Sequence, residues 1–390
     1  MINVVFLLKL RQIGVVQMRT SFIACLLLII SGKLHAYSNP TIKVLLFKTS
    51  QAVKISSPSG LIPISHEIRF KNDRSLKIKA KGKSTLLLDN IVPLTKPLLL
   101  KSESKISVLK PNTRFSRRYQ GLIEVRPFKK GVYVINHLPL ETYLAGVLNA
   151  EISTKWAIEV VKVQAVISRT FALYQMENRK NRLWHVTSGL SDQVYLGADI
   201  ADKRGQHAIQ QTRGFVVTYQ GKLAQTFYHS NCGGVTEDAG ALWKYSYPYL
   251  KVRTVPYGKS DPRFSWEARM SQADLERVFR KLGFKGQNIK ELTISEYSPS
   301  GRVAKIYLNG LPQNSYKGKD FRRAAGYRKI QSLLFKISGI PGGILFSGTG
   351  NGHGVGLSQW SAKEMAEKGY QYYDIIEYFY QGTKLKQYWK

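Results

Sequence analysis

Glu151 is the residue of this sequence whose position is most unusual for its type. It follows Tyr143 and Val147 at intervals of four, so the three side chains share one face of a predicted helix. Burial on that apolar face and the negative helix C-terminus both disfavour a charged carboxylate, so a raised pKa is expected. A carboxylic acid that stays protonated near neutral pH can act as a general acid. The alternatives are a side chain turned into solvent where the helix frays, or a core ion pair with Arg169.

Three other segments carry candidate polar groups. Arg169 lies inside a predicted helix, where it either positions a substrate or the acid, or forms an ordinary buried ion pair. Residues 228–234 end a strand in a glycine-rich turn, and polar groups gathered at such a place often line a cleft. Residues 348–359 are dense in glycine, which favours close approach of the backbone to a ligand or strand, with a phosphate-binding loop as the alternative. His353 in this segment is either a substrate contact or a structural hydrogen-bonding group.

Metal binding is conceivable at His229 and Cys232, but two ligands three residues apart do not make a zinc site. Neither a CxxC nor an HExxH motif accompanies them. No base that would activate Cys232 as a nucleophile is identifiable. We therefore predict that the protein has no cofactor. If it did bind zinc, His229 and Cys232 would be the ligands.

The elements that must position these groups change in character along the chain. Residues 41–135 alternate in the manner of strands, for example at 76–81. Helices are predicted over 139–151, 155–180 and 271–282, hairpins over 215–228 and 292–308, and two helices over 358–380 with a break near Gly369. This order predicts an α+β fold with a β-rich part at 37–136 and a mixed helix and hairpin core with a cleft at 137–390.

The N-terminus indicates export. Residues 1–36 combine four basic residues, no acidic residue and an apolar run after Arg19, and they end at Leu34-His35-Ala36. This is the pattern of a signal peptide, and Met18 is an alternative start. The run is too short to span a bilayer comfortably, but an uncleaved anchor is the main alternative to cleavage. We expect the protein in the periplasm or the extracellular wall.

The composition narrows the partners. The 390 residues include 59 Lys and Arg against 25 Asp and Glu, a net charge of +34, and only two Cys. Two cysteines exclude a disulfide scaffold, and the 43% hydrophobic content excludes wholesale disorder. The charge requires a polyanionic partner or surface. Export favours an anionic envelope surface over nucleic acid, although a charge-driven membrane or nucleic-acid binder remains an alternative.

Taken together, the motifs resemble those of the SpoIID/LytB family. The resemblance rests on six ordered segments: 137–147 followed by Glu151, 163–173 around Gln164-Ala165-Val166, 192–197 (DQVYLG), 229–234 (HSNCGG), 247–250 (YPYL) and 352–360 (GHGVGLSQW). The segment after Glu151 departs from the family pattern, since Ile152-Ser153 replaces the usual Met-Pro and Ala157 follows Trp156 where Pro is common.

The resemblance implies a lytic transglycosylase that cleaves glycan strands of peptidoglycan, notably strands stripped of their peptides, with Glu151 as the acid. It also makes chemical sense, because a hydrolase normally needs two carboxylates and only one strong candidate is present. The 6-hydroxyl of the muramic acid would replace water as the nucleophile and leave a 1,6-anhydro end. The cleft residues expected to orient the sugars are Arg169, Gln193, Tyr195, His229, Ser230, His353, Ser358 and Gln359.

A second reading is also open. Some relatives are amidase enhancers, so the chain could instead be a non-catalytic wall-binding protein that stimulates a peptidoglycan amidase. Some family members bind zinc near the HSxxGG turn through histidine and paired cysteines, whereas only Cys232 is present here.

Overall fold

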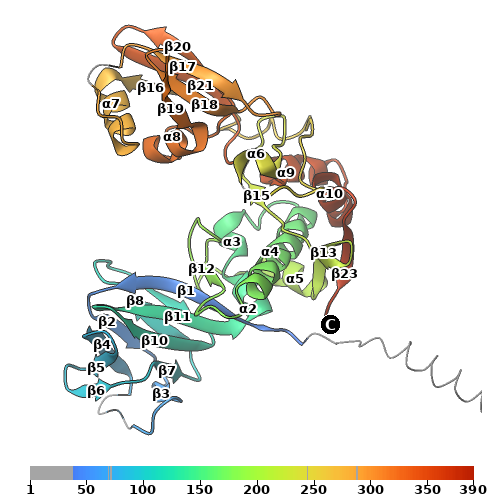
Figure 1. Cartoon of the computed structure of the whole chain (residues 1–390). Helices are drawn as coiled ribbons and strands as arrows, with labels where there is room; N and C mark the ends of the chain where they lie inside the picture. The colour runs from blue at the N-terminus through green and yellow to red at the C-terminus, as the bar shows by residue number, and fades with distance from the viewer. Residues whose placement is uncertain (1–37, 69, 71–72, 244, 287–288) are drawn as a thin grey trace, which may run out of the picture. The chain divides into compact units, whose positions relative to one another are not determined.

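The chain is described by a computed structural model that covers residues 38–390 except positions 69, 71–72, 244 and 287–288 (Figure 1). The predicted signal segment lies outside the described residues. Helices and strands are both abundant, which confirms the mixed α+β character predicted from the sequence. In the described part of the chain, no helix is long and apolar enough to cross a membrane.

The β-rich front part contains two six-stranded sheets. One has the order β12 (Val186–Thr187), β1 (Thr41–Thr49), β11 (Gly131–Pro139), β10 (Leu122–Phe128), β7 (Leu98–Lys101) and β3 (Ile62–Pro63). The other has the order β6 (Val92–Leu94), β5 (Thr85–Leu88), β4 (Ser75–Lys81), β2 (Val53–Ser56), β8 (Ile106–Leu109) and β9 (Ser116–Tyr119). Strand β4 contacts β11 and β5 contacts β10, so the sheets pack on each other.

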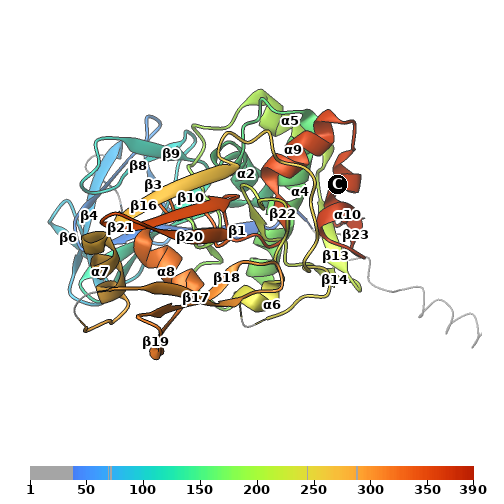
Figure 2. The ribbon, with the colours of Figure 1, turned by 90° about the horizontal axis from the view of Figure 1, so that it is seen from above.

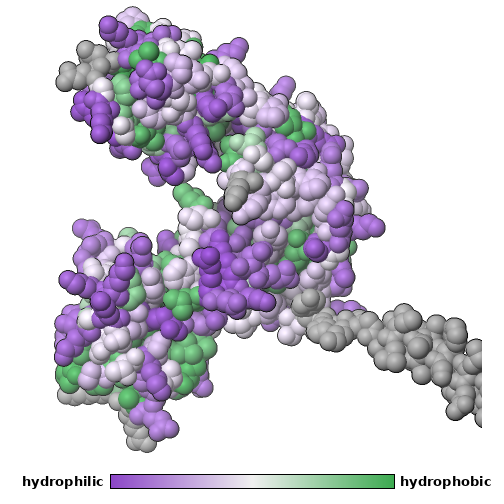
Figure 3. All heavy atoms as spheres, viewed as in Figure 1, coloured by the Kyte–Doolittle hydropathy of each residue, from purple (hydrophilic) through white to green (hydrophobic). Residues whose placement is uncertain are grey.

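The alternation in β4 explains this packing and leaves a basic outer face. Leu76 and Ile78 are fully buried, whereas Lys77 between them is exposed. Lys77 lies directly opposite Lys54 of β2, which is also exposed. Like charges in directly opposed positions destabilise a sheet, so stability alone does not account for this pair. Figure 3 shows hydrophilic and hydrophobic side chains interspersed over the β-rich front part.

The first predicted helix is interrupted. It forms two short helices, α2 (Leu140–Ala145) and α3 (Leu148–Glu151), instead of one that runs from 139 to 151. Between them lies Gly146, where a Cβ atom would collide with the ring of Tyr195 and the carbonyl of Gly197. The helix is therefore broken where residues 195–197 pack closely against this glycine. The spacing of apolar residues along 139–151 did not predict the break.

The long helix α4 (Ile158–Asn178) is the centre of the next layer. It is buried on most of its faces, including at Gln164, Ser168 and Arg169. It contacts α2, α5 (Lys203–Gln211), α9 (Gln359–Glu367), α10 (Tyr372–Phe379) and β13 (Phe215–Tyr219), an arrangement that can be followed in Figure 2. The predicted break at Gly369 is confirmed: this residue has a φ of +93° and separates α9 from α10.

Two small sheets join distant segments around α4. Strand β13 pairs with β14 (Lys222–Leu223) across Gln220-Gly221, where both φ values are positive, as in a type I′ turn, and with β23 (Lys384–Gln387). The predicted return strand is shorter than expected. Its last residues instead form β15 (Tyr228–His229), which pairs in parallel with β22 (Leu357–Ser358). Helix α6 (Ala239–Leu242) follows β15 in the chain.

Residues 265–349 build a separate hydrophobic cluster that the sequence did not distinguish from the rest of the core. One sheet has the order β16 (Ser265–Ser271), β21 (Gly343–Thr349) and β20 (Phe335–Ile340). The other has the order β17 (Leu292–Tyr297), β18 (Val303–Leu308) and β19 (Leu311–Lys317). Helices α7 (Gln272–Lys281) and α8 (Gly318–Ala325) complete this part, and Ser271 caps α7 as predicted.

Candidate functional site

Glu151 is the last residue of α3 and is partly buried. Its Oε1 accepts a hydrogen bond of 2.7 Å from the backbone N–H of Val194. A hydrogen bond with the Tyr228 side chain adds a second contact. Desolvation by burial raises the pKa of the Glu151 carboxyl, and these two hydrogen bonds offset only part of that effect.

A chain of side-chain hydrogen bonds holds Tyr228 in place. The hydroxyl of Tyr143 donates to Oε1 of Gln193 at 3.1 Å, and Nε2 of Gln193 donates to the hydroxyl of Tyr228 at 3.2 Å. Because Tyr228 accepts from Gln193, its own proton is available for the Glu151 carboxyl. Burial and the Glu151 charge both raise the pKa of Tyr143 and of Tyr228, so both hydroxyls stay protonated.

A second set of amides connects Glu151 to α4 and α9. Nε2 of Gln359 lies 3.4 Å from the backbone oxygen of Glu151 and 3.2 Å from Oε1 of Gln164. Gln164 in turn donates to Ser168 Oγ at 3.0 Å. Gln164 and Ser168, two of the buried polar residues of α4, thus belong to the support of Glu151. We call Glu151, Tyr143, Gln193, Tyr228, Gln164, Ser168 and Gln359 the Glu151 network.

The structure places His353 beside His229, the residue that follows Tyr228 in the chain. The rings of His229 and His353 lie 5.1 Å apart. His353 Nδ1 accepts from the Val355 N–H at 3.0 Å, and burial lowers the pKa of His353 to about 3. Burial also lowers the pKa of His229, and its Nε2 is buried with no hydrogen-bond partner among the described residues. Both rings are therefore neutral at physiological pH.

The glycines of the 348–359 segment allow this close packing. A Cβ atom at Gly352, which has a φ of +129°, would collide with the side chain of His229. At Gly354 it would collide with the guanidinium of Arg302. The backbone therefore approaches side chains of other segments here. The predicted approach to another strand is met separately, by the pairing of β22 with β15.

Arg302 comes from the 265–349 cluster and was not singled out by the sequence. Its side chain is 1% exposed, and its Nη2 donates to the carbonyls of Cys232 at 2.7 Å and Val235 at 2.9 Å. It thereby supports the glycine-rich turn that follows His229. Arg302 lies in the turn between β17 and β18. No repeating pattern of residues in that turn indicates a contact with a distant segment, so the sequence did not predict this one.

Cys232 and the serines near it have structural partners. The Cys232 N–H donates to Ser358 Oγ at 3.1 Å, and Ser358 Oγ lies 2.7 Å from Ser361 Oγ. The carbonyl of Ser230 accepts from the Trp360 N–H at 3.0 Å. Within the described ranges, no group of three or more His, Cys, Asp or Glu could hold a metal ion, so the donor set does not fit a zinc ion at His229 and Cys232.

Arg169 and Tyr195 lie in the interior rather than in the Glu151 network. Arg169 is 0% exposed and forms a two-pronged ion pair with Glu141, at 3.0 and 2.8 Å. This is the buried ion pair considered from the sequence, but with Glu141 in place of Glu151. The Tyr195 hydroxyl donates to Asn136 Oδ1 at 2.8 Å, and its ring packs on Tyr143. Their placement supports the fold and offers no surface for the sugar contact predicted for them.

Within the Glu151 network, the carboxyl group suited to proton transfer is that of Glu151. Asp192, the acidic residue beside Gln193, is engaged by Arg179 at 2.9 Å and by the Thr187 N–H and hydroxyl, both at 2.9 Å. Sequence reasoning missed Tyr228, Tyr143 and Gln164 as members of the site. Two features of the sequence could have indicated them: Tyr228 is adjacent to the candidate His229, and Gln164 is a polar residue within the apolar sequence of α4.

The chain is similar in sequence to several known proteins. A family model described as "Stage II sporulation protein" matches residues 128–219, and one described as a domain of unknown function matches 251–356. The chain is 31% identical to an uncharacterized protein of Brachyspira hyodysenteriae, over 69% of this chain and 73% of that protein. It is 31% identical to stage II sporulation protein D of Bacillus amyloliquefaciens, over 68% and 79%. It is 25% identical to the amidase enhancer of Bacillus subtilis, over 63% of this chain but only 40% of that protein.

Proposed function

Because this chain belongs to the SpoIID/LytB family, we propose that it is a lytic transglycosylase of peptidoglycan with Glu151 as its acid. The observation that carries the proposal is the carboxyl of Glu151, whose pKa is raised by burial while Val194 and Tyr228 hold it in place. A protonated carboxyl in a fixed position is what general-acid cleavage of a glycosidic bond requires.

The reaction needs no second carboxylate. The Val194 N–H on Oε1 favours the proton on Oε2 of Glu151, from which it passes to the glycosidic oxygen as the bond to the anomeric carbon breaks. The 6-hydroxyl of the same muramic acid then attacks that carbon and gives its proton back to the carboxylate. The products are a 1,6-anhydro end and a free 4-hydroxyl, no water is consumed, and Glu151 returns to its protonated form. The proposed substrate is the glycan strand stripped of its peptides.

The remaining sequence predictions join this proposal. We propose that the protein is exported and acts in the periplasm or extracellular wall, released or held by an uncleaved signal, without a cofactor. Two groups of residues would shape the substrate site. Gln193 and Gln359 would do so through the Glu151 network, and the neighbouring turns would contribute His229, Ser230, His353 and Ser358. The purified protein should generate anhydro ends, detected by mass spectrometry, from amidase-treated strands.

The similarity to the amidase enhancer favours a second candidate function. In that case the chain binds the wall and stimulates a peptidoglycan amidase without cleaving glycan itself. The assay for anhydro ends in the absence of amidase separates the two, because only the transglycosylase produces them alone.

Cleavage should be lost as the pH rises through the raised pKa of Glu151, because only the protonated carboxyl can act as the acid. Replacing Tyr228 with Phe removes a hydrogen bond that favours the charged form, so the alkaline limb of the pH–rate profile should move upward by about 0.5–1 pH unit. Tyr219→Phe, a tyrosine on β13, is the control that should leave the limb in place. A downward shift in Tyr228→Phe would contradict the assigned hydrogen bond.

The opposed Lys54 and Lys77 suggest that the basic face binds an anionic envelope polymer. Lys54→Glu would replace a like-charge pair with an opposite-charge pair, which should stabilise the fold by about 0.2–1 kcal/mol while weakening retention on immobilised poly-L-glutamate. Stability is measured by urea unfolding and retention by the salt concentration that elutes the protein. Lys222→Glu makes the same charge change at the exposed residue of β14. If the two variants lose retention equally, the retention depends on net charge and not on the basic face, and the proposal is contradicted.

A further inference from the structure

Glu151 lies on a segment that its own sequence does not hold in place. Helix α3 has only four residues, and a helix this short is not stable by itself. Residues 152–157 connect α3 to α4 through turns and bends, and they contain no proline that would fix the backbone. The position of the Glu151 carboxyl must therefore depend on contacts with other parts of the chain.

Asp202, at the N-terminus of α5, provides such contacts on both sides of Glu151. Its Oδ2 accepts a hydrogen bond of 2.9 Å from Nδ2 of Asn149 and another from the hydroxyl of Thr154. Asn149 precedes Glu151 in the chain and Thr154 follows it. The other oxygen, Oδ1, accepts from the Gly205 N–H at 2.7 Å and thereby caps α5. One carboxylate thus ties the segment that carries the acid to the start of a longer helix.

Arg204 holds the backbone of the same segment. Its Nε donates to the carbonyl of Thr154 at 2.8 Å, and its Nη2 donates to the carbonyl of Trp156 at 2.9 Å. The ring of Trp156 lies 5.0 Å from the ring of Trp360, which follows Gln359 of the Glu151 network on α9. The chain after Glu151 is therefore held by α5 on one side and by α9 on another.

The contacts of Asp202 belong to the same stretch of chain that holds the Glu151 carboxyl. The Val194 N–H donates to Oε1 of Glu151 at 2.7 Å, and Val194 lies shortly before Asp202 in the chain. Between them, the carbonyl of Ile200 accepts from Nδ2 of Asn149. If the backbone shifts at Asp202, the carboxyl moves relative to the Val194 N–H.

We infer that Asp202 and Arg204 are positioning residues for Glu151, which act through the backbone of residues 149–156. A misplacement of reacting groups by about 1 Å can lower a rate about a hundredfold, so contacts of this kind have large effects on turnover. The inference rests on the proposed function, because it assigns the residues that place the acid of that reaction.

Asp202→Asn separates positioning from the capping of α5. Asparagine caps a helix as well as aspartate does, so its oxygen stays on the Gly205 N–H while its NH₂ group cannot accept from Asn149. We expect kcat for anhydro-end formation on amidase-treated strands to fall about tenfold to a hundredfold, with KM unchanged. An unchanged kcat would overturn the inference, as would a raised KM at unchanged kcat, which would make Asp202 a binding residue.

A second readout follows the Glu151 contact without turnover. The pair Gln193-Val194 occurs once in the sequence, so ¹³C-carbonyl Gln combined with ¹⁵N Val selects the resonance of this one amide. Its hydrogen bond to the carboxyl shifts the amide proton downfield, and Asp202→Asn should move it upfield as that bond lengthens. A Val194 resonance that stays in place in Asp202→Asn would overturn the inference.

Thr154 offers a matched pair of variants that keeps the test decisive if Asp202→Asn does not fold. Thr154→Val preserves the shape of the side chain but removes the hydroxyl that Asp202 accepts from, so kcat and the Val194 resonance should change as in Asp202→Asn. Thr154→Ser retains the hydroxyl and should behave as the wild type. Equal kcat values in the two Thr154 variants would contradict the assignment.

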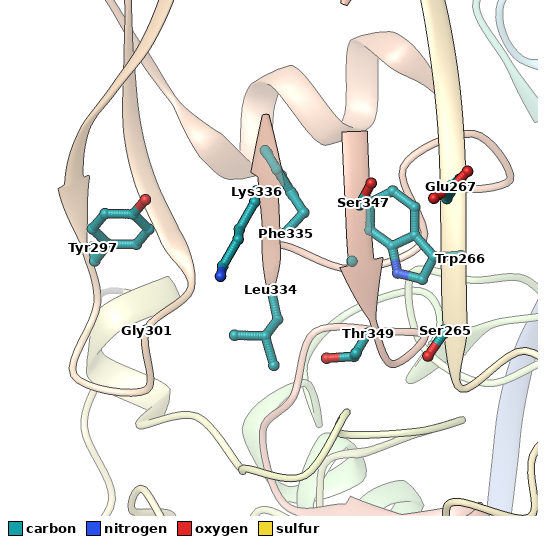
Figure 4. Close-up of a pocket in the computed structure, with 11 residues that line it drawn as sticks. Ser265, Trp266, Glu267, Tyr297, Gly301, Leu334, Phe335, Lys336, Ser347 and Thr349 are labelled. Atoms are coloured by element: carbon teal, nitrogen blue, oxygen red, sulfur yellow. The ribbon is translucent and has the colours of Figure 1, made fainter. Parts of the chain in front are cut away.

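Two further changes from carboxylate to amide are controls. Asp238→Asn alters the aspartate that caps α6, where it pairs with Lys251 at 2.7 Å. Glu267→Gln alters a side chain of β16 that lines a cavity of the 265–349 cluster (Figure 4). Both should leave kcat and the Val194 resonance at their wild-type values. A comparable fall in kcat in either control would overturn the inference, because any loss of negative charge would then suffice.

The two proposals fail in different ways. If the positioning role is wrong, Asp202→Asn and the wild-type protein form anhydro ends at the same rate and share the Val194 resonance. If the transglycosylase proposal is wrong, the wild-type protein forms no anhydro ends, while the Val194 resonance still moves in Asp202→Asn.

Discussion

Replacing Glu151 with Gln is expected to lower the rate of anhydro-end formation about 10²–10⁴-fold, toward the upper end of what the loss of a general acid or base costs. The upper end is expected because one carboxyl serves first as acid and then as base. Glutamine keeps nearly the same shape, and its side-chain oxygen can still accept from the Val194 N–H. The substitution thus removes proton transfer while it preserves the contacts of the site. Mass spectrometry of amidase-treated strands measures the result.

Glu177→Gln is the matched control, because this glutamate is exposed at the end of α4 and lies outside the Glu151 network. It should cleave at the wild-type rate. Wild-type activity in Glu151→Gln would refute the mechanism. If neither the wild type nor the variant forms anhydro ends, but both stimulate an amidase equally, the chain is an enhancer.

Stability provides an independent check on the same residue. A carboxyl whose pKa is raised in the folded state stabilises the fold below its unfolded pKa, and this contribution is lost as the pH rises through the folded pKa. Above that pH the wild-type protein carries a partly buried charge that glutamine lacks. Glu151→Gln should therefore gain stability relative to the wild type between pH 5 and pH 8, as measured by urea unfolding at both pH values.

Arg169→Met should destabilise the fold by about 3–5 kcal/mol, the usual cost of breaking a buried ion pair by removing one partner. The guanidinium is fully buried and holds both carboxylate oxygens of Glu141. It also donates to the carbonyls of Phe215 at 3.1 Å and Ile209 at 3.3 Å. The substitution leaves Glu141 charged in the interior and two carbonyls without this donor. Urea unfolding at pH 7 measures the loss.

The double variant Arg169→Met with Glu141→Leu distinguishes the pair from the packing around it. Removing both charges should restore much of the stability, because the buried carboxylate that loses its Arg169 contacts in the single variant is then absent. If Arg169→Met instead leaves the stability unchanged and weakens glycan binding, Arg169 contacts the substrate, as the sequence predicted.

The sequence predicted local features with good accuracy where neighbouring residues decide them. The cap at Ser271, the tight turn at Gln220-Gly221 and the helix break at Gly369 depend on residues a few positions apart, and all three occur in the structure. The break at Gly146 was missed because it involves packing of Tyr195 from a later segment. Likewise, β15 pairs with β22, more than a hundred residues away, rather than extending its hairpin.

In the candidate site, too, some features follow from neighbouring residues and others depend on contacts between distant segments. The spacing of Tyr143, Val147 and Glu151 predicted that the carboxyl would turn inward, and Glu151 is partly buried, although Tyr143 and Glu151 belong to two short helices and not to one helix face. Whether Arg169 pairs with Glu151 or with Glu141 depends on which segments meet in space, and only the tertiary structure decided it. Tertiary structure also decided that Gln193 and Tyr228 act on Glu151, since hydrogen bonds between distant segments leave no period in the sequence.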